Sequence, residues 1–209
     1  MRIAREGYPL IFTGAALSIA GAAAGWRSAA GALGMATIAV AAFFRDPERR
    51  IPTDEGVVVS PADGKVVSIA DVSRGSRFSD AATRVSIFLS PLDVHINRLP
   101  VAGKVDDVRY QSGKFLAAYK ETASERNEQN ALRIVDEKGR AFGVVQIAGA
   151  VARRIVCWVR PGDRLGRGAR FGLIMFGSRT DIYLPNGLNL EIREGQRVKG
   201  GETILGRFV

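Results

Sequence analysis

The sequence predicts a mainly β domain, of sandwich or barrel-sandwich type, preceded by a hydrophobic helical hairpin. Three observations lead to this fold class. Residues 8–44 carry a single charge, and the rest of the chain alternates short apolar runs with Gly, Pro and Asp,. A short turn-and-strand motif also occurs twice. We therefore expect two parts, residues 1–44 and residues 45–209.

Composition excludes several classes of protein. The 209 residues suffice for one domain with an appendage or for two small domains,. Disorder is excluded because 46% of the residues are hydrophobic and only 24% are charged,. Cys157 is the only cysteine and His95 the only histidine, which excludes an internal disulfide, a cysteine-rich zinc site and a cluster of histidine ligands,. We expect no metal site.

The apolar N-terminal stretch predicts the helical hairpin. Arg27 divides it into Tyr8–Trp26 and Ser28–Phe44, each near the roughly 17–25 residues that a membrane-spanning helix requires,. Trp26 suits interfacial depth, and Arg27 can extend toward lipid head groups. The many Ala and Gly residues permit close packing of the two helices. We expect membrane association, with the hairpin either spanning or re-entrant.

Arginines flank both ends of this stretch. Arg2 and Arg5 precede it, and Arg45, Arg49 and Arg50 follow it. The positive-inside rule places both ends on the cytoplasmic side, which predicts the cytoplasmic face of the cell (inner) membrane as the location. A signal peptide and a buried pair of soluble helices are the alternatives. The first is disfavoured because the stretch is too long and lacks a clean cleavage site.

Beyond the polar segment Arg45–Ile51, ten short apolar or β-branched runs predict the strands of the β domain,. One polar segment near Lys114–Asn127 predicts the only soluble helix. The ten runs are Val57–Val59, Lys65–Val72, Arg84–Leu89, Lys104–Tyr110, Leu132–Val135, Phe142–Ile147, Ile155–Val159, Phe171–Phe176, Leu188–Ile192 and Thr203–Phe208.

A weak internal repeat supports a barrel-sandwich architecture. Pro61–Val66 (PADGKV) recurs as Pro100–Val105 (PVAGKV). The tail Gly195–Gly206 likewise combines turn residues with a short strand-like run. This resembles the lipoyl- and biotinyl-type domains, so a membrane-tethered binding module without catalysis is one hypothesis. Strand starts of the type Gly-Lys-Val also recur by chance.

The basic charge suggests an anionic partner. The chain has 30 Lys and Arg against 21 Asp and Glu, a net charge of +9. Nucleic acid and anionic lipid both attract such a surface. No RNA-recognition pattern is present, so we expect no nucleic acid and favour an anionic membrane surface.

Three residues have the chemistry of a nucleophile, a base and an orienting acid: Ser178, His95 and Asp63,. Ser178 follows Gly177 at the end of an apolar run, and a glycine lets a nucleophile approach its carbonyl. His95 lies in a polar loop and can transfer a proton near neutral pH. Each residue alone also fits an ordinary turn or core position. A serine hydrolase without self-cleavage is a further alternative.

The ordered motifs together resemble the phosphatidylserine decarboxylases, in the short form with an N-terminal membrane hairpin. The likeness extends over essentially the whole chain. It rests on Phe44–Pro47 (FRDP), Ser60–Gly64 (SPADG), Asp93–Arg98 (DVHINR), Arg126–Glu128 (RNE), Ala148–Gly149, Arg153–Ile155 (RRI) and Met175–Arg179 (MFGSR).

The chain departs from the larger members of this family at two places. Their cleavage motif is usually Leu-Gly-Ser-Thr, whereas Phe176-Gly177-Ser178-Arg179 stands here. They also carry a second histidine three residues after the first, where this chain has Arg98. The Gly-Ser pair that the chemistry requires is kept.

The resemblance implies a proenzyme that cleaves itself between Gly177 and Ser178. Ser178 attacks the carbonyl of Gly177, with His95 as base and Asp63 orienting it, to give a β chain (1–177) and an α chain (178–209). Ser178 becomes a pyruvoyl group, the one cofactor expected, which forms a Schiff base with phosphatidylserine and accepts electrons as CO₂ leaves. The product is phosphatidylethanolamine, and His95 returns the proton.

The resemblance also implies partners. The α chain is held to the β chain by strand pairing, for which Leu188–Ile192 and Thr203–Phe208 are suited. Arg153, Arg154 or Arg179 is expected to contact the phosphate or carboxylate of the lipid. A homodimer is compatible with the sequence, which does not decide the oligomeric state.

Overall fold

The computed structural model describes residues 2–72, 78, 80–113, 127–149, 154–175 and 178–208. The chain divides into two compact units, Met1–Glu48 and Arg49–Val209. The helix predicted near Lys114–Asn127 lies outside the described residues, except for Asn127 itself.

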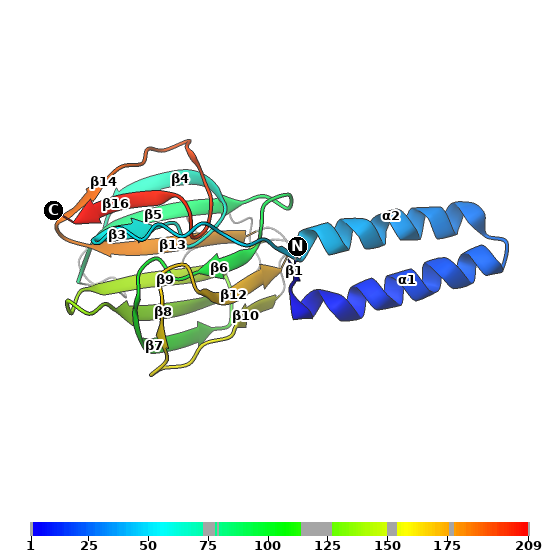
Figure 1. Cartoon of the computed structure of the whole chain (residues 1–209), viewed down its shortest axis with the longest axis horizontal. Coiled ribbons are helices and arrows are strands. Elements are labelled where there is room, and N and C mark those ends of the chain that lie inside the picture. Colours follow the sequence, from blue (N-terminus) through cyan, green and yellow to red (C-terminus); the bar gives the residue numbers. More distant parts are fainter. Residues whose placement is uncertain are drawn as a thin grey trace. The chain divides into compact units, whose positions relative to one another are not determined.

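The N-terminal unit is helical (Figure 1). Its two helices are joined through Gly25, whose φ of 82° a glycine adopts without strain,. Among the described residues, no helix has both the length and the apolarity needed to cross a membrane. The elements of this unit are β1 (Arg2–Ile3), the 3₁₀ helix η1 (Arg5–Gly7), α1 (Tyr8–Ala23), α2 (Arg27–Phe43) and β2 (Arg45–Asp46), with β1 and β2 paired.

The two helices pack through small side chains. The Ser18 hydroxyl donates a hydrogen bond to the Ala30 carbonyl across the pair at 2.8 Å. A Cβ on Gly14 would stand only 2.3 Å from the Thr37 hydroxyl oxygen, so these backbones approach closely. Large apolar side chains point outward instead, and Ile19 is 71% exposed. In a soluble pair of amphipathic helices the large apolar side chains pack between the helices, so this arrangement is the opposite.

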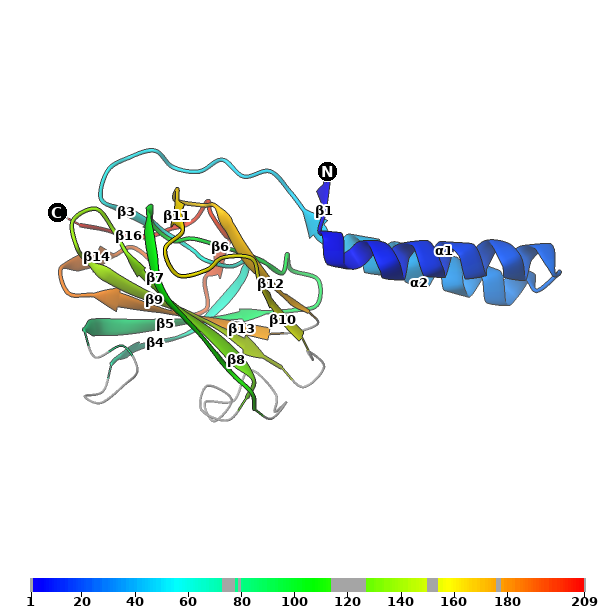
Figure 2. The same cartoon turned by 90° about the horizontal axis from the view of Figure 1, so that it is seen from below.

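The second unit is mainly β, as predicted, and its strands form three sheets (Figures 1 and 2). The largest has eight strands in the order β11-β7-β8-β9-β13-β5-β4-β15, and the others have the orders β10-β12-β6 and β14-β16-β3. Every neighbouring pair is antiparallel. The strands are β3 (Val57–Val59), β4 (Gly64–Asp71), β5 (Ala81–Leu89), β6 (Ile96–Arg98), β7 (Gly103–Gln111), β8 (Gln129–Val135), β9 (Ala141–Ala148), β10 (Arg154–Cys157), β11 (Arg164–Leu165), β12 (Arg170–Met175), β13 (Ser178–Pro185), β14 (Leu188–Leu190), β15 (Arg197–Val198) and β16 (Ile204–Phe208).

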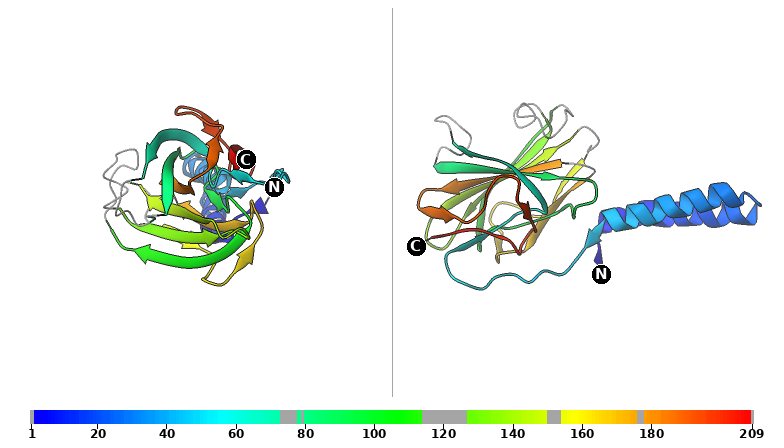
Figure 3. Two further views of the ribbon diagram at one scale, coloured as in Figure 1. Left: turned by 90° about the vertical axis from the view of Figure 1, so that its left-hand side faces the viewer. Right: turned by 90° about the horizontal axis from the view of Figure 1, so that it is seen from above.

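The sheets curve around a common apolar interior (Figure 3). Side chains alternate between the two faces of a strand, so Ile182 and Leu184 of β13 enter this interior together with Ile87, Leu132 and Val144 from its neighbours. All five are buried. Strand β13 is central in the eight-stranded sheet, because β5 and β9 pair with it on either side.

The two copies of the sequence repeat have the same local structure. Gly64 opens β4 and Gly103 opens β7, and each strand has a bulge two residues later. A Cβ on Gly64 would lie 2.2 Å from the Phe88 carbonyl oxygen, and one on Gly103 would lie 2.5 Å from that of Val135. The shared glycine is therefore required by the close approach of the neighbouring strand.

Replacement of either repeat glycine by alanine is expected to destabilise the β unit. Gly64→Ala and Gly103→Ala each force a methyl group against a backbone carbonyl, at a cost of about 1–3 kcal/mol in the free energy of unfolding. Gly166→Ala is the matched control, since a Cβ there meets nothing within 4 Å. Denaturant unfolding followed by Trp158 fluorescence measures all three variants. Equal stability of the Gly103 and Gly166 variants would contradict the packing argument.

Candidate functional site

Ser178 is the first residue of the central strand β13, where it pairs with Leu89 on one side and Ala148 on the other. Its side chain is fully buried, and its Oγ has no hydrogen-bond partner among the described residues. Gly177 lies outside the described residues. A buried hydroxyl without a partner is costly for the fold, which is characteristic of a group held for chemistry.

His95 is also fully buried and comes directly before β6. Its carbonyl accepts a hydrogen bond from the Ile174 amide at 3.2 Å, which extends the β6–β12 ladder by one step. Its Nδ1 lies 3.0 Å from the carbonyl oxygen of Asp93. Because a carbonyl oxygen only accepts, Nδ1 carries the hydrogen. In the neutral form of such a ring the lone pair lies on Nε2, the atom that would act as a general base.

The strands that carry these two residues run in the same direction. Ile174 packs on Ala148, and Gly172 adjoins Gln146, so β12 runs parallel to its neighbour β9. Both β6 and β13 are antiparallel to that direction, since β6 pairs with β12 and β13 pairs with β9. The start of β6 and the start of β13 thus lie at the same end of the fold.

The fold brings His95 and Ser178 to one place. Ile174 hydrogen-bonds to His95 and packs on Ala148, which is the direct cross-strand partner of Ser178. Two residues further along each strand, the Asn97 amide donates to the Thr180 hydroxyl at 3.1 Å. Since side chains two residues apart share a face, His95 and Ser178 face the same interior region.

Asp63 has different partners from those expected. The sequence predicts that it orients the imidazole, but its carboxylate accepts hydrogen bonds from Arg49 at 2.8 and 3.0 Å and from the Gly200 amide at 2.8 Å. Among the described residues, no hydrogen bond joins this carboxylate to His95. Burial raises the pKa of the Asp63 carboxyl above its ordinary value of 3.8, and Arg49 and the Gly200 amide offset that rise only in part,.

Asp93 is the residue that sequence reasoning missed. Its backbone carbonyl orients the imidazole, and its own carboxylate accepts hydrogen bonds from the amide and hydroxyl of Ser90 at 2.8 and 2.7 Å. Arg197 pairs with the other carboxylate oxygen. The spacing Ser90-x-x-Asp93 is a local signal for such a side-chain-to-backbone turn.

The three arginines that were expected to contact the lipid differ in their surroundings. Arg179 is 2% exposed and is bound to the Asp181 carboxylate and the Ser86 hydroxyl, so it has no group free for a lipid. Arg153 lies outside the described residues. Arg154 is exposed on β10, opposite Met175 at the end of β12, and has no ion pair within the described part of the chain.

Arg98, which stands where larger members have a second histidine, has a structural role. It is 4% exposed and donates a hydrogen bond from Nη1 to the Gly168 carbonyl at 3.0 Å. An arginine stays protonated at physiological pH, so it cannot serve as a general base. His95 therefore remains the one imidazole available to the site.

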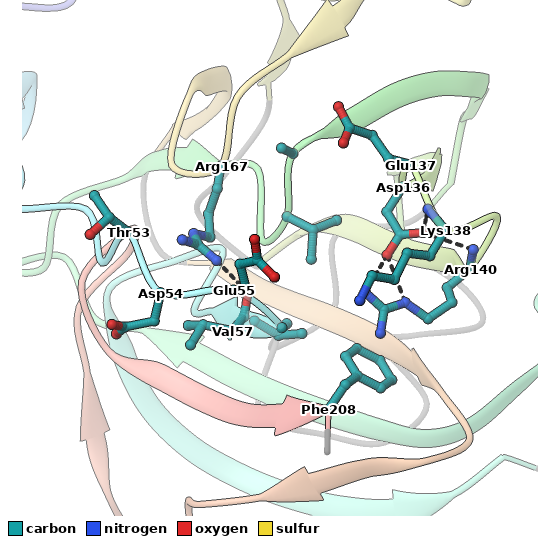
Figure 4. A pocket seen from close by; sticks show the side chains of 14 residues that line it. Thr53, Asp54, Glu55, Val57, Asp136, Glu137, Lys138, Arg140, Arg167 and Phe208 are labelled. Carbon is teal, nitrogen blue, oxygen red and sulfur yellow. Dashed lines mark hydrogen bonds and ion pairs between the residues drawn. The ribbon is translucent and has the colours of Figure 1, made fainter.

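A polar cavity of about 320 Å³ lies at the other end of the eight-stranded sheet (Figure 4). It adjoins the turn between β8 and β9, where Asp136 binds Arg140 and the Arg140 guanidinium stacks on the Phe208 ring at 3.6 Å. The Arg167 side chain in its wall donates to the Val57 carbonyl. Asp136 and Arg140 in its lining are thus paired with each other, and the length of β9 separates the cavity from Ser178.

Comparison with known proteins gives one consistent family. The family described as phosphatidylserine decarboxylase matches residues 36–206. A phosphatidylserine decarboxylase proenzyme of Symbiobacterium thermophilum is 48% identical over 99% of this chain and 95% of its own length. Proteins of the same name from Gluconobacter oxydans and Desulfotalea psychrophila are 48% and 42% identical, over 98% and 99% of this chain and 93% and 97% of their own lengths.

The Arg49–Asp63 pair is expected to show strong energetic coupling. Both side chains are largely buried, at 7% and 14% exposure, so removal of Arg49 leaves Asp63 without its cationic partner, and removal of Asp63 leaves Arg49 with the longer 3.7 Å contact to Glu202,. A double-mutant cycle with Arg49→Leu and Asp63→Asn should give a coupling of about 1–3 kcal/mol. The exposed pair Arg207–Asp54, at 3.7 Å, is the control and should couple only weakly,. Similar coupling in the two cycles would contradict the assignment.

Proposed function

The chain belongs to the phosphatidylserine decarboxylase family, and from that premise we propose which residues perform its chemistry. The protein is a proenzyme that cleaves itself, and the mature enzyme decarboxylates phosphatidylserine to phosphatidylethanolamine in phospholipid synthesis. The binding-module and serine-hydrolase alternatives gain no support from the comparisons. The observation that carries the proposal is the buried Oγ of Ser178, which has no hydrogen-bond partner among the described residues and lies at the same end of the fold as His95.

Self-cleavage begins with proton transfer from Ser178 to His95. The Nε2 lone pair takes the hydroxyl proton, because the Asp93 carbonyl fixes the hydrogen on Nδ1,. Oγ then attacks the carbonyl carbon of Gly177, and the peptide amide becomes an ester with a free amine on residue 178. Loss of the α proton of residue 178 with departure of the Gly177 carboxylate breaks the ester. Water then replaces ammonia at the new α-chain terminus, which leaves a pyruvoyl group.

The residues around position 178 fit a pyruvoyl group. The group has the carbon skeleton of Ser178 without its nitrogen, and the Ser178 Oγ makes no hydrogen bond within the described part of the chain, so the conversion removes no side-chain hydrogen bond seen there. It supplies a carbonyl that accepts electrons as CO₂ leaves the bound lipid. His95, at the same end of the fold, holds the proton that the substrate carbon must regain.

Asp63 supports the site through the backbone rather than through His95. The carbonyl of Pro61, two residues earlier, accepts a hydrogen bond from the Arg98 amide at 2.9 Å. The Arg49 and Gly200 contacts hold Asp63 in its turn. We propose that Asp63 fixes the turn against which β6 lies, and that the Asp93 carbonyl supplies the orientation expected of Asp63.

Strand pairing is proposed to retain the α chain after cleavage. Every strand from residue 178 onward, apart from the short β14, pairs with a strand of the β chain: β13 with β5 and β9, β15 with β4, and β16 with β3. β13 therefore contributes the longest contact. Of the two apolar runs that the sequence indicates, Thr203–Phe208 pairs with the β chain through β16, whereas Leu188–Ile192 pairs through β14 only with β16 of the α chain itself.

Arg154 is the residue proposed to contact the lipid head group. Its exposed guanidinium lies on β10 opposite Met175, close to the segment that precedes Ser178. Arginine binds phosphate and carboxylate oxygens with paired hydrogen bonds. The buried Arg179, which the sequence also indicates, is unsuited because Asp181 and Ser86 already bind it.

Membrane association of the helical unit is proposed from its packing. The contact between α1 and α2 is made by small residues and one interhelical hydrogen bond, whereas Phe12, Ile19, Met35 and Ile38 are each about 70% exposed. Lipid tails solvate such outward apolar side chains at no cost, and water does not. The flanking arginines favour the cytoplasmic face of the inner membrane, where the anionic substrate is found.

The equivalent geometry of the two repeats supports the finer barrel-sandwich assignment of the β unit.

Substitution of Ser178 or His95 is expected to block self-cleavage. Ser178→Ala removes the attacking oxygen and should leave one intact chain, whereas His95→Gln removes the base and should slow cleavage by at least about a hundredfold. Ser68→Ala, a serine elsewhere on β4, is the control and should cleave normally. Denaturing electrophoresis of newly synthesised chains measures each rate. Normal cleavage of the Ser178→Ala chain would refute the assigned cleavage site.

Insertion of the helical unit into lipid is tested by tryptophan fluorescence. The chain has two tryptophans, and Trp26 at the turn between the helices is 70% exposed. In a Trp158→Phe variant mixed with vesicles that contain phosphatidylserine with brominated acyl chains, Trp26 emission should shift to the blue and be quenched. The Trp26→Phe variant reports the background from Trp158. Emission from Trp26 that is unchanged by vesicles would contradict membrane insertion.

A further inference from the structure

A row of uncharged polar side chains crosses the interior next to Ser178. Asn130, Gln146 and Thr180 are direct cross-strand neighbours on β8, β9 and β13. Asn130 donates to Gln146 at 3.0 Å, Gln146 donates to Asn97 at 2.8 Å, and Asn97 donates to the Thr180 hydroxyl at 3.1 Å. We call these four residues the amide row. Asn97 comes from β6 in the other sheet, so the row joins the two sheets.

The amide row is buried, and the row beside it toward the core is apolar. Asn97, Gln146 and Thr180 are 0% exposed and Asn130 is 2% exposed. The next row of the same three strands toward the core consists of Leu132, Val144 and Ile182, all at 0% exposure. Apolar side chains at such positions are usually at least as stabilising as hydrogen-bonded amides. Stability therefore gives no reason for polar side chains here, and orientation does.

Gly172 leaves room for the side chain of Gln146, one member of this row. A Cβ on Gly172 of β12 would lie 2.8 Å from Nε2 of Gln146 and 2.4 Å from the Val156 carbonyl oxygen. The glycine lets the Gln146 amide fit between β12 and β9, where it reaches Asn97. The strand that precedes the cleavage site is thus shaped around the same amide.

The row fixes the two strands that hold the reacting groups. Asn97 lies two residues after His95, and Thr180 lies two residues after Ser178, on strands that run in the same direction. A directional hydrogen bond between Asn97 and Thr180 sets the register and separation of these strands, which apolar contacts alone leave looser. Gln146 then ties both strands to the centre of the eight-stranded sheet.

We propose that the amide row positions His95 against Ser178, and that Asn97, Gln146 and Thr180 are positioning residues for chain cleavage. The inference rests on the proposed function, because it assumes that His95 and Ser178 react. Thr180 is the third residue of the future α chain, whereas Asn97 and Gln146 belong to the β chain. The same contacts therefore keep His95 in place after cleavage, when it returns the proton.

The test compares hydroxyl loss with hydroxyl retention at Thr180. Full-length chains are synthesised in a bacterial cell-free system with phospholipid nanodiscs, and the first-order rate of cleavage is followed across neutral pH. Thr180→Val keeps the volume but removes the acceptor for Asn97, and should slow cleavage by about ten- to a hundredfold. Thr180→Ser keeps the hydroxyl and should cleave close to the wild-type rate.

A matched variant separates positioning from general loosening of the core. Ile182→Val removes one methyl group from the same face of β13, two residues along, and should leave the cleavage rate unchanged. The thermal unfolding midpoint is recorded for every variant, and Thr180→Ala replaces Thr180→Val if the latter does not fold. In the cleaved enzyme, Thr180→Val should lower kcat with little change in KM. The reason is that the amide row contacts the strand that follows His95 and is not proposed to contact the lipid.

The possible outcomes are distinguishable. Slow cleavage by Thr180→Val together with rescue by Thr180→Ser supports the positioning role. Cleavage by Thr180→Val at the wild-type rate, or an equal slowing by Ile182→Val, overturns it while the proposed function stands. Failure of the wild-type chain to cleave overturns the proposed function, and the inference with it.

Discussion

Two-sided pairing of β13 is the constraint on which the rest of the structure depends. The strand that begins at Ser178 lies between β5 and β9, with ladders on both sides from its first residue onward. A chain cut directly before such a strand, with the nitrogen of residue 178 lost as ammonia, leaves the ladder from Arg179 onward paired on both sides. Self-cleavage can therefore create a new chain terminus in the interior without loss of the fold, which a cut within the strand would not allow. The new terminus is formed where the serine is already buried.

The second requirement is a base with a defined tautomer, and backbone geometry supplies it. His95 donates from Nδ1 to the carbonyl of Asp93, whose own carboxylate is held by Ser90 and Arg197. A carbonyl oxygen accepts the Nδ1 hydrogen and so keeps the ring oriented through the backbone,. Such a ring can accept the serine proton in one step and return a proton to the substrate carbon in another.

Much of this arrangement could be predicted from the sequence, and the reasons are local. The resemblance to the family predicted the roles of Ser178 and His95, since a Gly-Ser pair alone also fits an ordinary turn and a lone histidine an ordinary surface or core position. The repeated Gly-Lys-Val indicated two equivalent strand starts, which close backbone contacts now explain. Asp63 was expected to orient His95, but the turn that holds it is bound by Arg49 and the Gly200 amide, contacts set by the folded chain and not by the local sequence. The amide row could not be predicted either, since Asn97, Gln146 and Thr180 are brought together only by the sheet register.

The most direct test of this account is the intact mass of the denatured wild-type chain, with and without a carbonyl-reactive hydrazine. The account predicts two species divided between Gly177 and Ser178. The smaller one should be lighter, by one ammonia, than simple hydrolysis would leave it, and should gain the mass of one hydrazone. A single chain with no reactive carbonyl, in protein shown to be folded, would contradict it. Two chains of which the smaller begins with an ordinary serine would show that the bond is cut without formation of the catalytic carbonyl.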